Sequence, residues 1–439
     1  MKKIVLVLIF LVSLQNLIIK AQTNDKEDAV PKLSNPISES WLKETLSGSL
    51  PRMVFNKDIV EDLKIKLETD PVIKNMYEAI KLNAYQILDQ PLLERVQTGK
   101  RILDVSRTML LRINLLGVVY LLEEDQVILE RIDQEVRAVC SFTDWNPSHY
   151  LDVAEMSMAV AFALDWTLDQ LPKKTIKLAK ETLINKGIYP SWPEYGGKNQ
   201  WWVKGHNNWN QVCHGGMIAA SIAIADEEPG LAVQTINRAL YGLPVALSQY
   251  MPDGVYPEGP GYWNYGTSFS VATAAMLETA FGSDFGIKTY PGFTNSAMFK
   301  VMCTSPSGLY YNFSDCGDKR GRSGDNILAW FAAKTGNRIY FEKERFLIPP
   351  DKITLDRFSG ASLAWMSQYE EKSNKNLPNV WVGNGTNPIA VFKNDEGDRD
   401  YYFAGKGGAG SLSHGNMDAG SFVFELDGVR WVIDPGVQP

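Results

Sequence analysis

The chain has 439 residues, of which 45% are hydrophobic and 22% charged, and its formal net charge is −7 at pH 7. This length exceeds what one small core needs and predicts two domains, one of them large. The negative net charge argues against a nucleic-acid partner, because phosphate binding draws on Lys and Arg. The 12 Trp and 18 Tyr give an aromatic content that is frequent in carbohydrate-handling proteins, since aromatic faces stack on sugar rings.

The N-terminal segment has the pattern of a secretory signal. Lys2 and Lys3 precede an apolar run from Ile4 to Leu14, and Ala21 offers a small residue for cleavage. The run is too short for a confident membrane span. We therefore predict a signal peptide over residues 1–21, export to the periplasm or medium, and no membrane insertion after cleavage.

A polar, Pro-containing stretch over residues 22–45 is predicted to be an N-terminal tail. From there to residue 354 helical periodicity dominates, and several segments are apolar nearly all round, as expected of helices buried between neighbours. This pattern predicts an (α/α) toroid of successive helical hairpins over 46–354. The segments with the strongest periodicity are 101–122, 126–140, 150–168, 175–185, 207–226, 231–250, 267–280 and 324–334.

After Pro349 the pattern changes to short aromatic or β-branched runs divided by Gly, Asn and Asp. We predict an antiparallel β domain over 355–439, with a hairpin that turns at Asp427-Gly428. Five or six short strands would leave open sheet edges, so the chain is expected to be the front part of a longer protein. The predicted strands are 362–366, 379–382, 390–393, 401–404, 421–426 and 430–433.

The stretch KGHNNWNQVCHGGM, residues 204–217, holds two of the four histidines beside several amide side chains. One asparagine is expected to cap a helix. His206, Asn207 and Asn208 together exceed what a cap needs, and donors near a helix N-terminus can hold a carboxylate. His214 lies on the face shared with Asn207 and either lines this cleft or packs in the core.

The stretch PDGVYPEGPGYWNYGTSF, residues 252–269, is predicted to be a Gly/Pro-rich loop that presents Tyr262. Eliminative cleavage of a uronate polymer needs a base for the C5 proton, an acid for the departing oxygen and donors that neutralise the carboxylate. A tyrosine can act as the acid or the base if nearby positive or donor groups bring its pKa down from about 10. Tyr262 and Tyr265 are therefore the candidates for proton transfer, and the turn at residues 259–261 favours Tyr262.

Other residues of these regions are candidates for sugar contacts. Trp202, Trp263 and Tyr256 are predicted to stack on sugar rings or to pack, and Tyr265 is also a candidate substrate contact. Glu258 is a candidate polar contact, and Arg320 belongs to a basic cluster that either binds acidic groups or is solvated.

The stretch LSHGNMDAGSFVFELDGVRWVIDPG, residues 412–436, adds a third set of polar groups. A hairpin brings its two ends together, so His414, Asn416, Asp418 and Asp434 are expected to converge on a metal or a cleft. Turn and strand-end chemistry is the competing explanation for the two aspartates.

In these motifs the chain resembles the heparinase II/III-like polysaccharide lyases: GHNNWNQV, PEGPGYWNYGTSF, and SHGNMDAGSF followed by WVIDPG. The resemblance implies an (α/α) toroid followed by an antiparallel β-sandwich, and cleavage of uronate-containing glycans by β-elimination. It places His206 at the position of a catalytic His, Tyr262 at that of the Tyr acid/base and His414 at that of a second active-site His. Asn207 or Asn208 resembles the Asn that neutralises the substrate carboxylate.

The sequence departs from the family at the expected metal site. The resemblance implies a divalent metal, usually zinc, with a His where this chain has Asn416 and an Asp at Asp434. Asn is a poor zinc ligand, so zinc, an oxygen-ligated calcium ion and no metal all stay open. Gly266 stands where some members carry an Arg.

The sequence thus predicts an exported polysaccharide lyase whose partner is an acidic polysaccharide, with the oligomeric state open. A glycoside hydrolase that uses Glu258 and Asp315 as paired carboxylates is one alternative. A non-catalytic protein that binds acidic glycans is another. The candidate substrates are heparan sulfate, chondroitin or dermatan sulfate, hyaluronan, alginate and other uronans.

Overall fold

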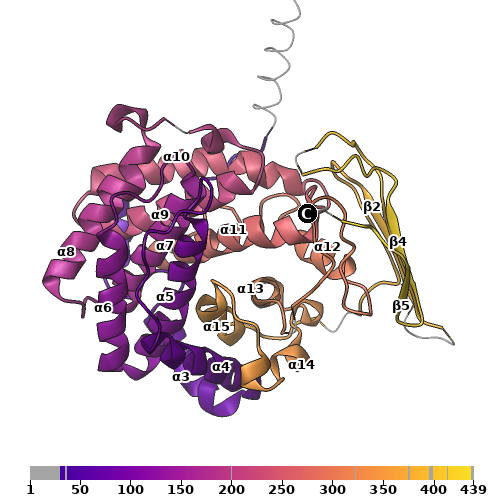
Figure 1. Ribbon diagram of the computed structural model, residues 1–439, viewed down its shortest axis with the longest axis horizontal. Helices are drawn as coiled ribbons and strands as arrows, with labels where there is room; N and C mark the ends of the chain where they lie inside the picture. Colours follow the sequence, from indigo (N-terminus) through magenta and orange to yellow (C-terminus); the bar gives the residue numbers. More distant parts are fainter. Residues whose placement is uncertain are drawn as a thin grey trace, which may run out of the picture.

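The computed structural model contains a helical domain followed by one antiparallel sheet, which stands beside the helices (Figure 1). The predicted signal peptide lies outside the described residues. Those residues are 30–34, 37–198, 200–321, 323–373, 376–394, 399–412 and 414–436.

Six of the described helices form a closed inner ring. Each packs on the next along the chain, and the last packs back on the first. This arrangement confirms the predicted toroid. The ring helices are α5 (Leu103–Glu123), α7 (Tyr150–Trp166), α9 (Asn208–Ile224), α11 (Gly259–Phe281), α13 (Asn326–Thr335) and α15 (Ser359–Ser367).

Outer helices return the chain between members of the ring, so that α6 packs on α5 and α10 packs on α9. The ring helices consequently start at the same end of the toroid. Hydrogen bonds join the N-termini of neighbouring ring helices. Ile102 N, before α5, donates to Asp152 of α7 at 2.7 Å, and Asn326 of α13 donates to Ser359 Oγ of α15 at 3.0 Å. The other α-helices are α2 (Glu39–Thr45), α3 (Lys57–Thr69), α4 (Pro71–Leu88), α6 (Gln126–Cys140), α8 (Lys173–Thr182), α10 (Pro229–Leu247), α12 (Ser296–Met302) and α14 (Lys343–Phe346).

Small residues let the inner helices approach closely. All 17 residues of α7 are buried, and α9 packs against it through Gly216. A Cβ atom at Gly216 would lie 2.3 Å from the carbonyl oxygen of Ala154. Any larger residue would push these two helices apart.

Helix α5 is the one described helix that is long and apolar enough to cross a membrane. Its most apolar window is 72% buried inside the protein. The helix packs against α4, α6, α7 and α15, which is the environment of a core helix.

The prediction of a strand over 362–366 is wrong, because these residues belong to helix α15. All nine residues of α15 are buried. A short apolar run that is buried on every side has no periodicity to distinguish a helix from a strand. The change from helices to strands therefore falls between Ser367 and Val380, later than residue 355.

The sheet contains five described strands, paired in chain order and all antiparallel. The predicted hairpin is confirmed: β4 and β5 are joined by Asp427 and Gly428, both with positive φ (51° and 75°), as a tight hairpin turn requires. The strands are β1 (Val380–Gly383), β2 (Ile389–Asn394), β3 (Tyr401–Lys406), β4 (Phe422–Leu426) and β5 (Val429–Val432).

One face of the sheet is attached to the segment that follows α12. Tyr402 donates to the carbonyl oxygen of Met302 at 2.8 Å, and Arg430 donates to that of Tyr310 at 2.7 Å. Tyr311 donates to the carbonyl oxygen of Ser421 at 2.7 Å. These bonds anchor β3, the start of β4 and β5 to the helical domain.

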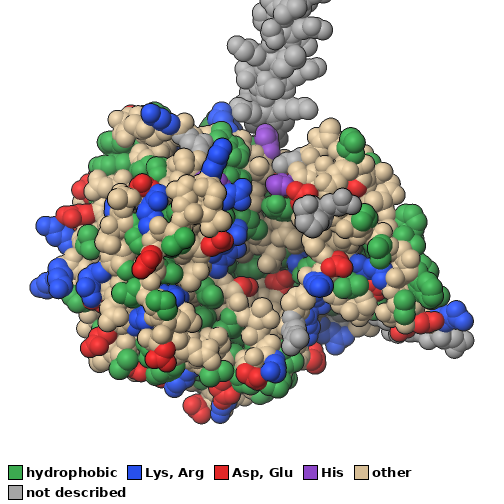
Figure 2. Space-filling view, viewed as in Figure 1, with side chains coloured by type: hydrophobic (Ala, Val, Ile, Leu, Met, Phe, Trp, Pro, Cys, Tyr) green, Lys and Arg blue, Asp and Glu red, His purple; other side chains and the backbone are tan. Residues whose placement is uncertain are grey.

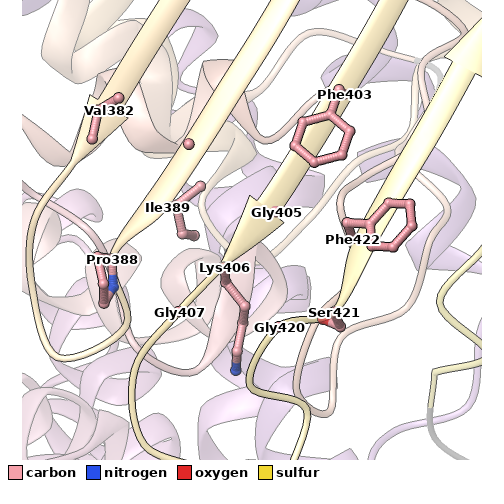
Figure 3. A pocket seen from close by; sticks show the side chains of 11 residues that line it. Val382, Pro388, Ile389, Phe403, Gly405, Lys406, Gly407, Gly420, Ser421 and Phe422 are labelled. Atoms are coloured by element: carbon pink, nitrogen blue, oxygen red, sulfur yellow. The ribbon is translucent and has the colours of Figure 1, made fainter.

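The opposite face carries exposed apolar side chains, among them Trp431, which is 68% exposed. Phe403 and Phe422 stack there with ring centres 5.6 Å apart. They border a shallow groove of about 390 Å³ that runs past Ile389 to Lys406 at the strand ends (Figure 3).

Candidate active site

A hollow separates the helical body from the part of the molecule that carries the sheet (Figure 2). Acidic and basic side chains line it, and histidine side chains lie at its edge. Three segments that are distant in the sequence meet here. Tyr262 is in the first turn of α11, Asp315 is in the loop between α12 and α13, and His414 is in the loop between β3 and β4.

The predicted GPG loop is in fact the first turn of helix α11, which begins at Gly259. Gly259 has a φ of 84°, which a residue with a side chain rarely adopts, and Pro260 suits the start of a helix. The N–H of Gly261 donates to Sγ of Cys316 at 3.1 Å. This contact fixes the Asp315 loop against the helix that carries Tyr262.

Cys316 and Cys303 are both buried free thiols. A Cβ atom at Gly261 would lie 3.0 Å from Sγ of Cys316. Residue 261 therefore has to be small for the loop to approach α11.

The rings of Tyr262 and His414 are stacked, with centres 4.2 Å apart and planes inclined by 23°. Partial burial raises the pKa of Tyr262, and the nearby charges of Asp315 and Glu258 raise it further. Arg101 and Arg107 act in the opposite direction. The net shift of the pKa is upward, opposite to the lowering expected from the sequence, because burial outweighs the nearby arginines. The phenol therefore stays protonated, which suits a proton donor.

His414 is oriented by Asp315 through two hydrogen bonds. Nδ1 of His414 lies 2.7 Å from Oδ2 of Asp315, and the Asp315 N–H donates to the His414 carbonyl oxygen at 3.1 Å. A carboxylate at Nδ1 favours the tautomer with a proton there, so Nε2 is left as a proton acceptor. His414 has a φ of 55°, a conformation in which His is enriched.

The first predicted trio lies at the start of α9. His206 is exposed and, among the described residues, makes no hydrogen bond or ring contact with Tyr262 or His414. Asn207 is the N-cap, and its Oδ1 accepts from the Trp209 N–H at 3.2 Å. Asn208 is only 3% exposed.

The other polar residues of this stretch hold the core together. Nδ2 of Asn210 donates to the carbonyl oxygens of Val203 and Gly242 at 3.1 and 3.0 Å. Nε2 of Gln211 donates to the Tyr250 hydroxyl and to Ser270. They bind α9 to its neighbours and do not line a cleft.

His214 packs in the core, the second of the two outcomes that the sequence left open. It is fully buried, and its Nε2 lies 3.1 Å from the carbonyl oxygen of Val203. Burial lowers the pKa of His214 to about 3. A Cβ atom at Gly242 would lie 2.3 Å from the His214 ring, so that glycine makes room for it.

The predicted sugar-stacking tryptophans are buried. Trp202 and Trp263 are both 0% exposed, so their faces are not available to a sugar in this structure. The neighbouring Trp201 is 51% exposed and packs against Trp209, with ring centres 5.0 Å apart. Trp209 in turn meets the ring of His149 at 4.7 Å. Sequence position alone did not distinguish Trp201 from Trp202.

The remaining predicted substrate contacts already have protein partners. Tyr265 donates to Oε1 of Glu155 at 2.8 Å. Arg320 pairs with Glu342. Glu258 is 4% exposed and lies at the N-cap position of α11, close enough to Tyr262 to raise its pKa.

Two of the residues expected at a metal site, Asp418 and Asp434, have separate hydrogen-bond partners. Asn416 is exposed, and Oδ1 of Asp434 accepts from the Gly436 N–H at 2.9 Å, as in a strand-end turn. Asp418 pairs with Lys406 and accepts from the Ser314 N–H at 2.7 Å. Within the described residues no group of three or more His, Cys, Asp or Glu side chains is placed to hold a metal ion.

Sequence reasoning missed three charged residues at this end of the toroid: Arg107 on α5, Glu155 on α7 and Arg357 just before α15. It also missed His149, whose Nδ1 lies 2.6 Å from Asp152. The signal was present in the sequence, because Asp152, Glu155 and Asp165 interrupt a run that is otherwise mostly apolar and is fully buried. A buried carboxylate requires a partner, and Arg107 and Arg357 supply it for Glu155.

Comparison with protein-family models and with curated proteins finds no match for this chain. Among solved structures, the chain is similar to one titled "Crystal Structure of Heparinase III", with 12% identity and a TM-score of 0.49. The similarity covers 91% of this chain and 67% of that one. A likeness of this size leaves the activity open.

Proposed function

We propose that the protein is a lyase that cleaves an acidic polysaccharide by β-elimination, with Tyr262 and His414 as its proton-transfer pair. The observation that carries this proposal is the stacking of the two rings at 4.2 Å, with Nδ1 of His414 bound to Asp315. A phenol kept protonated beside an imidazole with a free acceptor nitrogen supplies the two groups that elimination needs.

The proposed reaction transfers one proton at each end of the breaking bond. Nε2 of His414 takes the proton from C5 of the uronate, and the electron pair of that bond forms the C4–C5 double bond. The bond between C4 and the bridging oxygen breaks, and the Tyr262 hydroxyl protonates that oxygen. Asp315 stabilises the imidazolium that forms on His414.

The carboxylate next to C5 has to be neutralised before this proton can leave. His206, Asn207 and Asn208 stay our predicted donors, with different accessibility. His206 is exposed, whereas Asn207 uses its Oδ1 in the helix cap and has only its NH₂ group for a substrate. Asn208 is buried and would act only after a local rearrangement.

Trp201 is the proposed sugar-stacking residue in place of Trp202. Its exposed ring lies just before α9, at the end of the toroid where the ring helices begin. A flat apolar surface at this end of the toroid would bind a second sugar of the polymer.

Export and metal binding stay proposals. The signal-like segment 1–21 supports export to the periplasm or medium, where extracellular polysaccharides are found. Asn416 and Asp434 as described do not fit a metal site, so no step of the proposed reaction involves a metal.

Product analysis tests the proposal. The protein is incubated with alginate, hyaluronan, chondroitin sulfate, dermatan sulfate and heparan sulfate, and the products are followed by ultraviolet absorbance and by reducing-end assay. Elimination gives an absorbing unsaturated uronate for each new reducing end. Reducing ends without absorbance would indicate hydrolysis by Glu258 and Asp315, and binding without cleavage would indicate a glycan-binding protein.

A further inference from the structure

A charged cluster lies one helical turn beyond Tyr262. Tyr265 follows Tyr262 by three residues, a spacing that puts two side chains on the same face of a helix. The Tyr265 hydroxyl donates to Glu155 at 2.8 Å, and the guanidinium groups of Arg107 and Arg357 each lie 5.0 Å from the centre of its ring. We call Arg107, Glu155, Tyr265 and Arg357 the arginine cluster.

The arginine cluster has an excess of positive charge. Glu155 is fully buried and contributes one negative charge, whereas Arg107 and Arg357 contribute two positive charges. The hydroxyl of Tyr265 is neutral, because burial raises its pKa well above the usual value. One positive charge is therefore not compensated within the cluster, and in a partly buried site it would attract an anion.

The two arginines differ in how firmly Glu155 holds them. Nη1 of Arg357 lies 2.7 Å from both carboxylate oxygens of Glu155, and its side chain is 22% exposed. Arg107 reaches Glu155 only through Nε, at 3.4 Å, and its side chain is 38% exposed. The Glu155 carboxylate does not use the Nη groups of Arg107. Arg107 is consequently the arginine that can bind a ligand.

The geometry points to Arg107 as a residue that binds the carboxylate of the glycan beside Tyr262, in addition to the donors proposed at the start of α9. Glu155, Tyr265 and Arg357 are then positioning residues. This inference rests on the proposed function, because it assigns the acidic group of the same substrate.

Charge at the site supports this assignment. Asp315 and Glu258 lie near Tyr262 and would repel a uronate carboxylate. Arg101 and Arg107 are the cations that oppose these two groups at Tyr262. A guanidinium presents two N–H groups in a plane that matches a carboxylate, which gives a stronger and better oriented contact than an amide does.

The test separates binding from chemistry. Affinity gels first identify the acidic polymer that most strongly retards the Tyr262→Phe protein. This protein, alone and with Arg107→Gln or Arg107→Lys added, is then titrated with that polymer and with its carboxyl-reduced form. Arg137→Gln is the matched control, because Arg137 is 46% exposed on the outer helix α6 and pairs with Asp133. Melting temperatures identify any variant that no longer folds.

We expect the Tyr262→Phe protein to prefer the acidic polymer, Arg107→Gln to abolish that preference, and Arg107→Lys to retain part of it. In the otherwise wild-type protein, Arg107→Gln should lower kcat/KM by about 100-fold, as expected for the loss of one charge-stabilising donor. A preference that survives in a folded Arg107→Gln protein overturns the inference. Equal binding of the two polymers by the Tyr262→Phe protein, with Arg107 unchanged, also overturns the inference. Binding that depends on Arg107 without cleavage by the wild-type protein would overturn the proposed function alone.

Discussion

The ring of Tyr262 stacks on the imidazole of His414 with 4.2 Å between ring centres, although the two residues are 152 positions apart in the sequence. One ring is carried by the toroid and the other by a loop of the sheet. Asp315 binds Nδ1 of His414 and so fixes the orientation of the pair.

Tyr262→Phe should lower kcat by about 100-fold or more, because it removes the proposed proton donor and leaves the stacked ring in place. The melting temperature should stay unchanged. Tyr85→Phe is the control, since Tyr85 lies near the end of α4 and bonds Asp125 at the protein surface. Ultraviolet product assays on both variants provide the measurement, and full activity in Tyr262→Phe would rule out the assigned role.

Asp315→Asn should reduce kcat with little change in KM, because the amide no longer stabilises an imidazolium at His414. Asp318→Asn provides a matched control in the same loop, where Asp318 is exposed. Initial rates over a range of polymer concentrations separate the two parameters. A change confined to KM would instead indicate that Asp315 contacts the substrate.

The contribution of His214 to the stability of the folded protein should fall as the pH is lowered from about 6.5 towards 3. Burial lowers the pKa of His214 to about 3 in the folded protein, whereas an unfolded chain has a histidine pKa of about 6.5. Between these values the unfolded chain binds a proton that the folded protein does not, so the free energy of unfolding decreases as the pH falls. For His214 alone this amounts to about 3 kcal/mol between pH 6.5 and 4.

Urea unfolding of the wild type and of His214→Gln at pH 6.5 and 4 isolates this contribution. The variant should be less stable at pH 6.5, and its stability disadvantage should shrink at pH 4, because it lacks the titrating group. A stability difference between the two proteins that is the same at both pH values would show that His214 does not contribute.

The adjacent tryptophans Trp201 and Trp202 should respond differently to alanine. Trp202→Ala should destabilise the protein by about 3 to 5 kcal/mol, because it empties a fully buried site. Trp201→Ala should leave stability nearly unchanged and raise KM for the polymer. Chemical denaturation and steady-state kinetics on both variants measure the contrast, and the reverse pattern would exclude Trp201 as a sugar contact.

Regular patterns in the sequence predicted much of the architecture. Helical periodicity gave five of the six ring helices, and the Asp427-Gly428 pair gave the β4–β5 hairpin, because both depend on local preferences. Helix α15 was missed, since a run of nine buried residues carries no amphipathic pattern.

The site was harder to predict, because a polar residue in a sequence does not reveal its partner. Asn210, Gln211 and His214 resembled site residues, yet each bonds to a group in the core. Conversely, Glu155 stood in an apolar run, and only the fold shows that Arg107 and Arg357 reach it. Tyr262 and His414 were both singled out from the sequence, and the fold brings them together; their chemical roles stay predictions.

The anchoring of the sheet has a consequence for heat inactivation. His414 lies in a loop between two strands that are held to the helical domain through Met302, Tyr311 and a few other contacts. If warming loosens this attachment, His414 moves away from Tyr262 while the closed helical ring stays intact. Enzymatic activity would then disappear at a lower temperature than the circular-dichroism signal of the helices, and cooling would restore it as long as the toroid had not melted.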